Sequence, residues 1–292
     1  MIPRRLDKYL ADATNMSRRE VYLAWDAERI EVRPSEAPWG DDYEPWSLIF
    51  AEDTVLLDGE PLELREPQHY FAFHKPEGVL TAVSDPHDRL CLAPWLAKLP
   101  PSIFPVGRLD RPTTGFLLLT DDGNLSFCLL RPWFGVPKEY HLRVRGRVLP
   151  DDERIEMLLA GVDIGDGKDP ATALKVEVLA DQIASDPRIG SETLLSVVVD
   201  EGRNRMVRRM ARGVGFKLEH LHRPRIGPVE MGEVAPGEWR RLSEDEVDAL
   251  WDACGGRADA RKRHIAALGR HAETWRAEGR PHHRLERWLE NL

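Results

Sequence analysis

Residues 106–123, VGRLDRPTTGFLLLTDDG, decide the fold that we expect for this chain. The apolar run at residues 116–119 is too short for a helix and predicts a buried strand, and the polar cluster at residues 120–123 predicts the turn that ends it. Asp110 lies in the turn before this strand, where enzymes often hold a nucleophile or a base on a loop fixed by rigid scaffold. An isolated aspartate more often only caps a turn with its side chain, so the rest of the chain must decide between the two interpretations.

Composition places the chain among globular proteins. It has 292 residues, of which 42% are hydrophobic, enough for one large domain or for a large and a small one. No apolar run approaches the roughly 20 residues that a membrane span requires, and the first residues lack the hydrophobic stretch of a secretory signal. We therefore expect a cytoplasmic protein without a membrane partner, and a monomer by default. The three cysteines have no CxxC or Cys/His spacing, so neither a disulfide framework nor a zinc site is indicated.

The net charge of −9 is distributed unevenly along the chain. Residues 36–66 carry ten acids against Arg65 alone, whereas residues 197–226 carry eight basic residues against three acids. A local patch, rather than the total, steers a polyanion toward a protein surface. The overall negative charge therefore does not exclude a nucleic-acid partner.

Residues 4–33 predict two short helices and a strand. Leu6, Leu10 and Ala13 recur at helical spacing, and Ser17 with Glu20 forms the capping-box signature that begins the second helix. Charge patterning alone gives a merely solvated face even odds against a binding face. The basic residues that can gather on this face are Arg4, Arg5, Lys8, Arg18 and Arg19.

Two further stretches carry candidate functional residues. Residues 138–145 alternate as a strand that places Lys138 and Tyr140 on its apolar face, although a tyrosine in a strand more often serves packing than chemistry. Residues 193–200 form a second apolar strand, and Gly202 lets the chain turn from it into a helix. The same patterns predict helices around residues 92–99, 151–161 and from Ser243 onward, and strands over residues 70–74, 171–179 and 217–225.

Three motifs together resemble those of a known family. Residues 106–123 resemble the active-site motif of RNA pseudouridine synthases of the RsuA/RluB/RluE/RluF-like group, approximately GRLDxxTxGLLLLTxDG. The KEY sequence at residues 138–140 resembles the family's second signature, and EGRNRMVRRM at residues 201–210 resembles its EGRNRxVRRM motif. The order of residues 4–33 and 55–62 is similar to the S4 RNA-binding module, with an acidic, Trp-rich insertion at residues 34–53. Three catalytic motifs in family order are more specific than any one of them.

The resemblance implies an α+β fold in three parts. Residues 1–66 would form a small S4-like α/β module that binds RNA. Residues 67–252 would form the pseudouridine synthase catalytic domain, with a mixed, mainly antiparallel sheet flanked by helices. Residues 253–292 would form a C-terminal helical tail.

The resemblance also implies an activity, the isomerisation of uridine to pseudouridine in ribosomal RNA, with 23S favoured over 16S and with no cofactor or metal. Asp110 would be the nucleophile or the base, Arg208 would keep it ionised and oriented, and Tyr140 would stack on the flipped uracil and is a candidate for removing its C5 proton. A covalent adduct and elimination to a glycal both stay open for Asp110. The basic residues expected to hold the RNA backbone in this domain are Lys75, Arg108, Lys138, Arg203 and Arg205.

The expected partner is ribosomal RNA or a pre-ribosomal particle, and two alternatives stay open. The chain could be a non-catalytic RNA-binding protein, such as an S4-type ribosome-assembly factor, or a pseudouridine synthase that acts on transfer RNA. An RNA-binding protein without activity predicts RNA affinity but no product. The presence of Asp110, Tyr140 and Arg208 together favours the enzyme.

Overall fold

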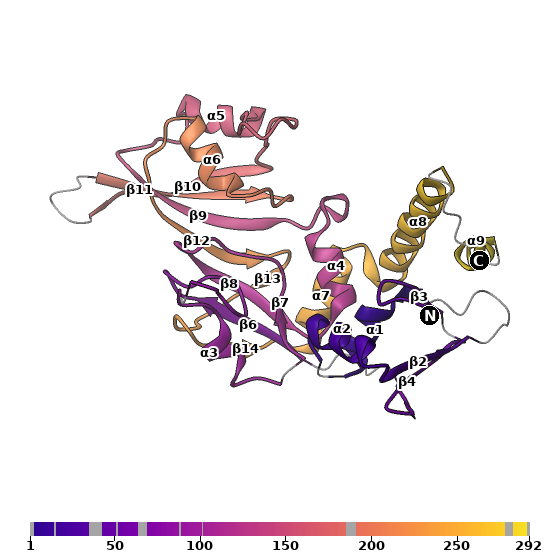
Figure 1. Cartoon of the computed structure of the whole chain (residues 1–292). Coiled ribbons are helices and arrows are strands. Elements are labelled where there is room, and N and C mark those ends of the chain that lie inside the picture. The colour runs from indigo at the N-terminus through magenta and orange to yellow at the C-terminus, as the bar shows by residue number, and fades with distance from the viewer. Residues whose placement is uncertain are drawn as a thin grey trace. The chain divides into compact units, whose positions relative to one another are not determined.

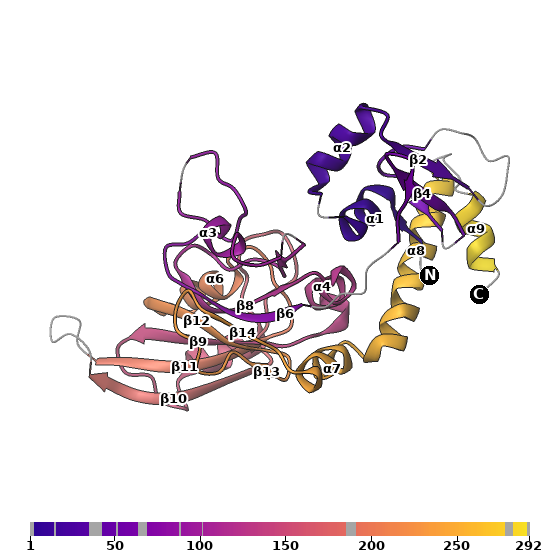
Figure 2. The ribbon, with the colours of Figure 1, turned by 90° about the horizontal axis from the view of Figure 1, so that it is seen from below.

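The computed structural model describes residues 3–14, 16–34, 43–50, 52–63, 69–87, 89–100, 102–184, 191–277 and 283–290. The chain divides into two compact units (Figures 1 and 2), one formed by Met1–Gln68 with Arg257–Leu292 and the other by His69–Gly256. The C-terminal residues thus belong to the same unit as the N-terminal ones. No helix in the described ranges is both long enough and apolar enough to cross a membrane.

The N-terminal part of the first unit has the two helices and the strand that residues 4–33 predict, namely α1 (Leu6–Ala13), α2 (Arg18–Asp26) and β2 (Ile30–Arg33). It also contains β4 (Thr54–Leu57) and β5 (Glu60–Pro61), and β1 (Arg4–Arg5) paired to β3 (Leu48–Ile49). The capping box of Ser17 and Glu20 is formed at the start of α2. Leu6 and Leu10 of α1 are fully buried and pack with Val21 of α2 and with Val55 of β4, so the strands and both helices share one small core.

Two C-terminal helices, α8 (Gly256–Ala277) and α9 (His283–Glu290), complete this unit (Figure 2). Leu268, Ala272 and Leu285 form a second apolar cluster with Leu48 and Phe50. Arg284 of α9 donates to the Asp53 carboxylate at 2.5 Å and to the Tyr43 hydroxyl at 2.7 Å. The tail is therefore packed against residues from the segment that the sequence marks as an acidic insertion; residues 35–42 of that segment lie outside the described residues.

A mixed, mainly antiparallel nine-stranded sheet forms the centre of the second unit (Figure 1). Its strands follow the order β10-β11-β9-β12-β8-β6-β14, with β13 paired to β12 and β7 paired to β8. Only β8 and β12 run parallel to each other among the pairs of this sheet in the described residues. The strands are β6 (Tyr70–Lys75), β7 (Phe104–Pro105), β8 (Thr113–Thr120), β9 (Lys138–Arg145), β10 (Lys175–Ala184), β11 (Ser191–Val199), β12 (Leu218–Ile226), β13 (Val229–Glu230) and β14 (Trp239–Arg241).

The helices of this unit are α3 (Ala93–Leu96), α4 (Gly123–Leu130), α5 (Glu153–Ala160), α6 (Met206–Gly213) and α7 (Glu244–Ala253), with a 3-10 turn at Pro132–Phe134. One apolar cluster joins α5 and α6 to β9 and β11, and another joins β6 and β8 to the segment around α3. Tyr140 of β9 packs against both clusters. It therefore stands where the two halves of the core meet.

Strand β8 is buried along its whole length, as its apolar run predicts. The polar cluster after it does more than end the strand, because the Asp122 side chain accepts hydrogen bonds from the backbone N–H groups of Asn124 and Leu125 and begins α4. The sequence did not predict α4. Its residues are apolar on most sides, so they lack the polar face by which a surface helix is recognised.

Candidate active site

Asp110 lies in a short loop before β8 that is fixed on several sides. The Thr113 N–H donates to the Asp110 carbonyl at 2.9 Å, and the Thr81 hydroxyl both donates to the Leu109 carbonyl and accepts from the Leu109 N–H, at 2.8 and 3.1 Å. The Asp110 side chain keeps 26% of its surface exposed. It lines a cavity of about 580 Å³, so a rigid loop presents the carboxylate to an open space.

Lys75 is buried and fixes this loop by hydrogen bonds to its backbone. Its side chain is fully buried, and its ammonium donates to the carbonyls of Pro76 at 2.8 Å, Arg111 at 3.3 Å and Thr113 at 2.8 Å. Burial lowers the pKa of Lys75 to about 8, against the opposing pull of the Asp110 charge. We expected Lys75 to contact RNA, and this expectation does not fit its placement, because its donors are directed at the backbone around Asp110.

Arg208 of α6 binds both the carboxylate and the loop. Its Nε lies 3.5 Å from Asp110 Oδ2, and its Nη2 donates to the Pro112 carbonyl at 3.0 Å and to the Thr113 hydroxyl at 2.9 Å. Burial lowers the pKa of Arg208 while the nearby Asp110 raises it, and a guanidinium stays charged at neutral pH in either case. One side chain thus supplies a positive charge to Asp110 and fixes the turn that carries it.

Arg205 approaches the same carboxylate from a different position. Its Nη1 lies 4.0 Å from Asp110 Oδ2, and half of its side chain, 51%, is exposed. Its backbone has a φ of 51°, in the left-handed region that non-glycine residues seldom adopt. The sequence predicts that Gly202 makes the turn before α6, but the positive φ is at Arg205, which lines the cavity in this strained conformation.

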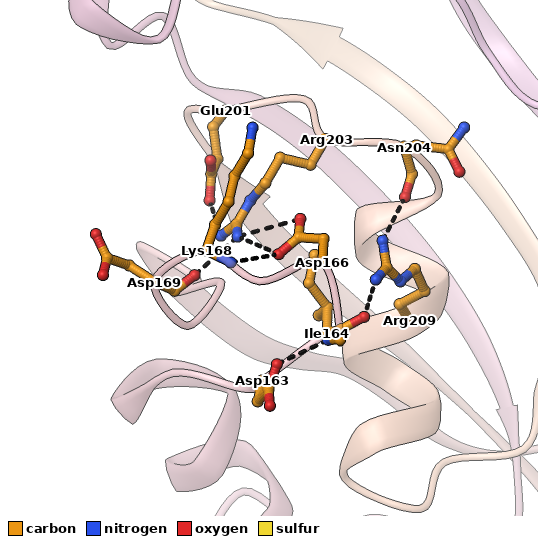
Figure 3. Close-up of polar contacts among 10 residues, drawn as sticks. Asp163, Ile164, Asp166, Lys168, Asp169, Glu201, Arg203, Asn204 and Arg209 are labelled. Carbon is orange, nitrogen blue, oxygen red and sulfur yellow. Dashed lines mark hydrogen bonds and ion pairs between the residues drawn. The ribbon is translucent and has the colours of Figure 1, made fainter.

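Figure 3 shows how this turn is held in place. The Arg203 guanidinium pairs with Glu201 at 2.5 Å and with Asp166 at 3.3 Å, and donates to the Asp169 carbonyl at 2.8 Å. Arg209 donates to the carbonyls of Asn204 and Ile164. These contacts tie residues 163–169 to the turn that carries Arg205.

Arg203 is therefore not placed as we expected from the sequence. Only 12% of its side chain is exposed, and two carboxylates already pair with its guanidinium. A direct RNA contact would have to compete with both ion pairs. Its position indicates a structural role instead.

Tyr140 lies on β9 between β11 and β12, half-buried at the same cavity. Its hydroxyl accepts a hydrogen bond from Arg223 Nη1 at 3.2 Å, and Arg223 Nε donates to the Phe116 carbonyl at 2.9 Å. Arg223 can come this close to β8 because residue 115 is a glycine and has no Cβ. A Cβ at Gly115 would lie only 2.3 Å from the Arg223 carbonyl oxygen. The structure thus brings the predicted catalytic residues Asp110, Tyr140 and Arg208 to one cavity.

Sequence reasoning did not single out Arg223. A signal was present, because Arg223 follows the buried Leu221 at the strand spacing of two and so occupies a core-facing position. A charged residue in such a position is rarely fully buried without a specific partner or role.

The other predicted RNA-binding residues have varied surroundings. Arg108 is exposed at the cavity and has no side-chain partner among the described residues. Lys138 is half-buried at the cavity, where its ammonium donates to the Val136 carbonyl at 2.8 Å. In the other unit Arg4 pairs with Asp12 and Arg5 pairs with Asp7, Arg19 is exposed, and the side chain of Arg18 lies outside the described residues. Lys8, the remaining member of that set, is half-buried on α1.

The part of the chain that the structure describes has no group of three His, Cys, Asp or Glu side chains arranged to hold a metal ion.

Comparison with known proteins identifies the family of this chain. The family model described as RNA pseudouridylate synthase matches residues 69–212, which contain Asp110, Tyr140 and Arg208. An uncharacterized RNA pseudouridine synthase of Aquifex aeolicus is 31% identical over 265 residues, which cover 90% of this chain and 100% of that protein. The chain belongs to the RNA pseudouridine synthase family.

Other relatives of the synthase include a protein named for its substrate. The ribosomal large subunit pseudouridine synthase B of Bacillus subtilis is 30% identical over 247 residues, which cover 84% of this chain and 95% of the relative. A crystal structure of a pseudouridylate synthase aligns with a TM-score of 0.56 and 27% identity, over 85% of this chain and 99% of that one. Similarity therefore extends over most of the synthase.

Proposed function

We propose that this synthase isomerises a uridine of large-subunit ribosomal RNA to pseudouridine, with Asp110 as the reacting carboxylate. The observation that carries the proposal is the ion pair of Asp110 and Arg208, 3.5 Å apart, at a cavity that Tyr140 also lines. Arg208 supplies a positive charge beside the carboxylate as a base enters the cavity and displaces water.

Each catalytic side chain has one task in this reaction. The N1–C1′ bond breaks, the base turns, and a C5–C1′ bond forms. Asp110 either adds to C1′ or removes a sugar proton to give a glycal. Tyr140 stacks on the uracil after the nucleotide leaves its helix, a step that costs a few kcal/mol and least in a loop or bulge.

The RNA backbone is held at the rim of the cavity and by the other unit. Arg108 and Arg205 are exposed beside Asp110, where a hydrated phosphate can reach them. Residues 1–66 would act as an S4-like module that binds RNA. Its contacts would come from the basic residues of β1, α1 and α2, namely Arg4, Arg5, Lys8, Arg18 and Arg19.

The preference for large-subunit RNA rests on the similarity to the Bacillus subtilis relative. The test is incubation of the purified synthase with separate transcripts of 23S, 16S and transfer RNA, followed by nucleoside analysis. Pseudouridine in the 23S transcript alone supports the proposal. Product only in transfer RNA would favour the second alternative, and RNA binding without any product would favour an assembly factor.

A further inference from the structure

A half-buried cation, Lys138 on β9, and a buried one, Arg223 on β12, lie together at the active-site cavity. Only 4% of Arg223 is exposed. The Arg223 charge also acts on Lys138, and burial together with this neighbour lowers the pKa of Lys138 to about 8. Neither side chain is part of the ion pair between Asp110 and Arg208.

Neither cation has a carboxylate within 4.0 Å among the residues that the structure describes. Lys138 Nζ donates to the carbonyls of Val136 at 2.8 Å and Asp200 at 3.5 Å, and the more distant Asp200 charge partly offsets the effect of Arg223. Arg223 donates to the Phe116 carbonyl and the Tyr140 hydroxyl, while its buried Nη2 has no hydrogen-bond partner within the described ranges. A buried charge without a counter-charge costs several kcal/mol, and this applies to Arg223. A fold that keeps Arg223 and the half-buried Lys138 at one cavity is suited to an anion that forms there.

A backbone phosphate is the less suitable anion. Phosphates are strongly hydrated, and Arg108 and Arg205 offer exposed guanidinium groups at the rim. Arg223, by contrast, is buried at the hydroxyl end of Tyr140, the side chain on which the base is expected to stack. Arg223 and the neighbouring Lys138 therefore lie at the part of the cavity that is expected to take the base.

We propose that Lys138 and Arg223 stabilise the uracil anion that forms when the N1–C1′ bond breaks. This inference rests on the proposed function. In that step both electrons of the bond stay with the base, and their charge is shared among N1, O2 and O4. C1′ gains its electron pair either from the Asp110 carboxylate or from the C2′–H bond, whose proton passes to Asp110. When C5 bonds to C1′, the Asp110–C1′ bond breaks in the first case, and C2′ regains its proton from Asp110 in the second. The C5 hydrogen is then lost and N1 gains a proton, so the product is an isomer of the substrate and Asp110 is regenerated.

Electrostatic stabilisation of this kind should act on the rate and not on RNA affinity. A preorganised donor aimed at developing negative charge typically contributes about 100-fold to 1000-fold in rate. We expect Arg223→Met and Lys138→Met each to lower the single-turnover rate at saturating RNA by at least about 100-fold. The Kd for RNA should stay within about threefold of the wild-type value, because rim residues hold the backbone.

Arg225→Met is the matched control. Arg225 lies on the same strand but pairs with Glu139 and Glu230 and does not line the cavity. The Arg225→Met substitution removes a guanidinium of equal size from the same strand, and we expect this variant to keep the wild-type single-turnover rate. Arg223→Lys keeps the charge and should recover at least about tenfold of the loss seen in Arg223→Met.

The isotope effect of ¹⁵N at N1 of the target uridine separates chemistry from misfolding. If the two cations stabilise the departing base, bond breaking becomes more rate-limiting in Arg223→Met and Lys138→Met, and the isotope effect rises above the wild-type value. A variant that has merely lost active molecules by misfolding keeps the wild-type isotope effect, and its thermal unfolding shifts.

Three outcomes overturn the proposal. They are an unchanged single-turnover rate in both methionine variants, a slowed reaction with an unchanged isotope effect, and a loss confined to RNA affinity, which would assign the pair to a phosphate. All are measured against a wild-type synthase that makes pseudouridine. Absence of product with the wild type would count instead against the proposed function itself.

Discussion

Arg208 binds Asp110 and the loop that carries Asp110 at the same time. Its Nε faces the carboxylate at 3.5 Å, and its Nη2 holds the Pro112 carbonyl at 3.0 Å. The Arg208 guanidinium therefore both supplies a positive charge to the Asp110 carboxylate and fixes the position of the loop that carries it. A lysine has a single nitrogen and cannot reproduce both contacts.

We accordingly predict that Arg208→Lys lowers kcat by about 100-fold, because a small displacement of the reacting group costs this much. Arg208→Met, which also loses the positive charge, should lower kcat by roughly a further tenfold, since electrostatic stabilisation is removed as well. Single-turnover kinetics with saturating RNA measures both. Equal rates for Arg208→Lys and the wild type would show that the contacts to Pro112 and Thr113 do not position Asp110.

Arg203 and Arg205 are two residues apart and should respond differently to substitution. Arg205→Met should weaken RNA binding and reduce the slope of log K against log salt by about 0.7–0.9, as expected for the loss of one phosphate contact. Arg203→Met should leave this slope unchanged and lower thermal stability, because its guanidinium pairs with Asp166 and Glu201. A shallower slope in Arg203→Met would mean that Arg203 leaves these partners to bind RNA.

The sheet face opposite Tyr140 carries a group of histidines that makes stability depend on pH. The His222 ring lies 5.4 Å from His74, 6.4 Å from His141 and 6.5 Å from His220, and its Nδ1 is 2.9 Å from the Thr114 hydroxyl. Burial, with the neighbouring imidazoles, lowers the pKa of His222 from 6.5 to about 4. Between these two values the unfolded chain binds more protons than the folded one.

The free energy of unfolding should therefore fall as the pH falls from about 6.5 toward 4. His222→Gln removes this titrating group and should make the decline shallower. Urea titrations at pH 7, 6 and 5 measure the slope for both proteins. Identical slopes would show that His222 takes up its proton equally in the folded and unfolded chains.

The C-terminal tail should stabilise the unit to which it belongs. Asp53 has a fully buried side chain, and Arg284, 15% exposed, pairs with it at 2.5 Å. Arg284→Met leaves a buried carboxylate without this partner and should cost about 3–5 kcal/mol of unfolding free energy. Arg276→Met is the control, because Arg276 is 64% exposed in its pair with Glu286 and should cost at most about 1 kcal/mol. Equal losses in the two variants in urea would contradict this account.

Much of the fold was predictable because its signals are local. The capping boxes at Ser17 and Ser243, the alternation of residues 138–145 and the apolar run in β8 each specify their element without help from distant residues. The same holds for the position of the three proposed catalytic residues, which lie in motifs that carry their own turn and strand signals.

The residues that were missed or misplaced depend on contacts distant in sequence. Lys75 and Arg203 are basic residues next to turns, and only the folded chain shows that carbonyls 36 and 38 residues away and a carboxylate 37 residues away already bind them. The docking of α9 on Asp53 joins residues 231 positions apart. Arg223 was missed for the same reason, because its hydrogen-bond partner Tyr140 lies 83 residues earlier in the sequence.

The central claim is that Asp110 carries out the isomerisation of a ribosomal uridine. The most direct test is pseudouridine mapping of ribosomal RNA, by base-specific chemical modification and primer extension, in cells with and without the gene. One stop in 23S RNA should vanish with the gene, return with the wild type and stay absent with Asp110→Asn, although this variant still binds RNA. Restoration of the stop by Asp110→Asn would contradict the account.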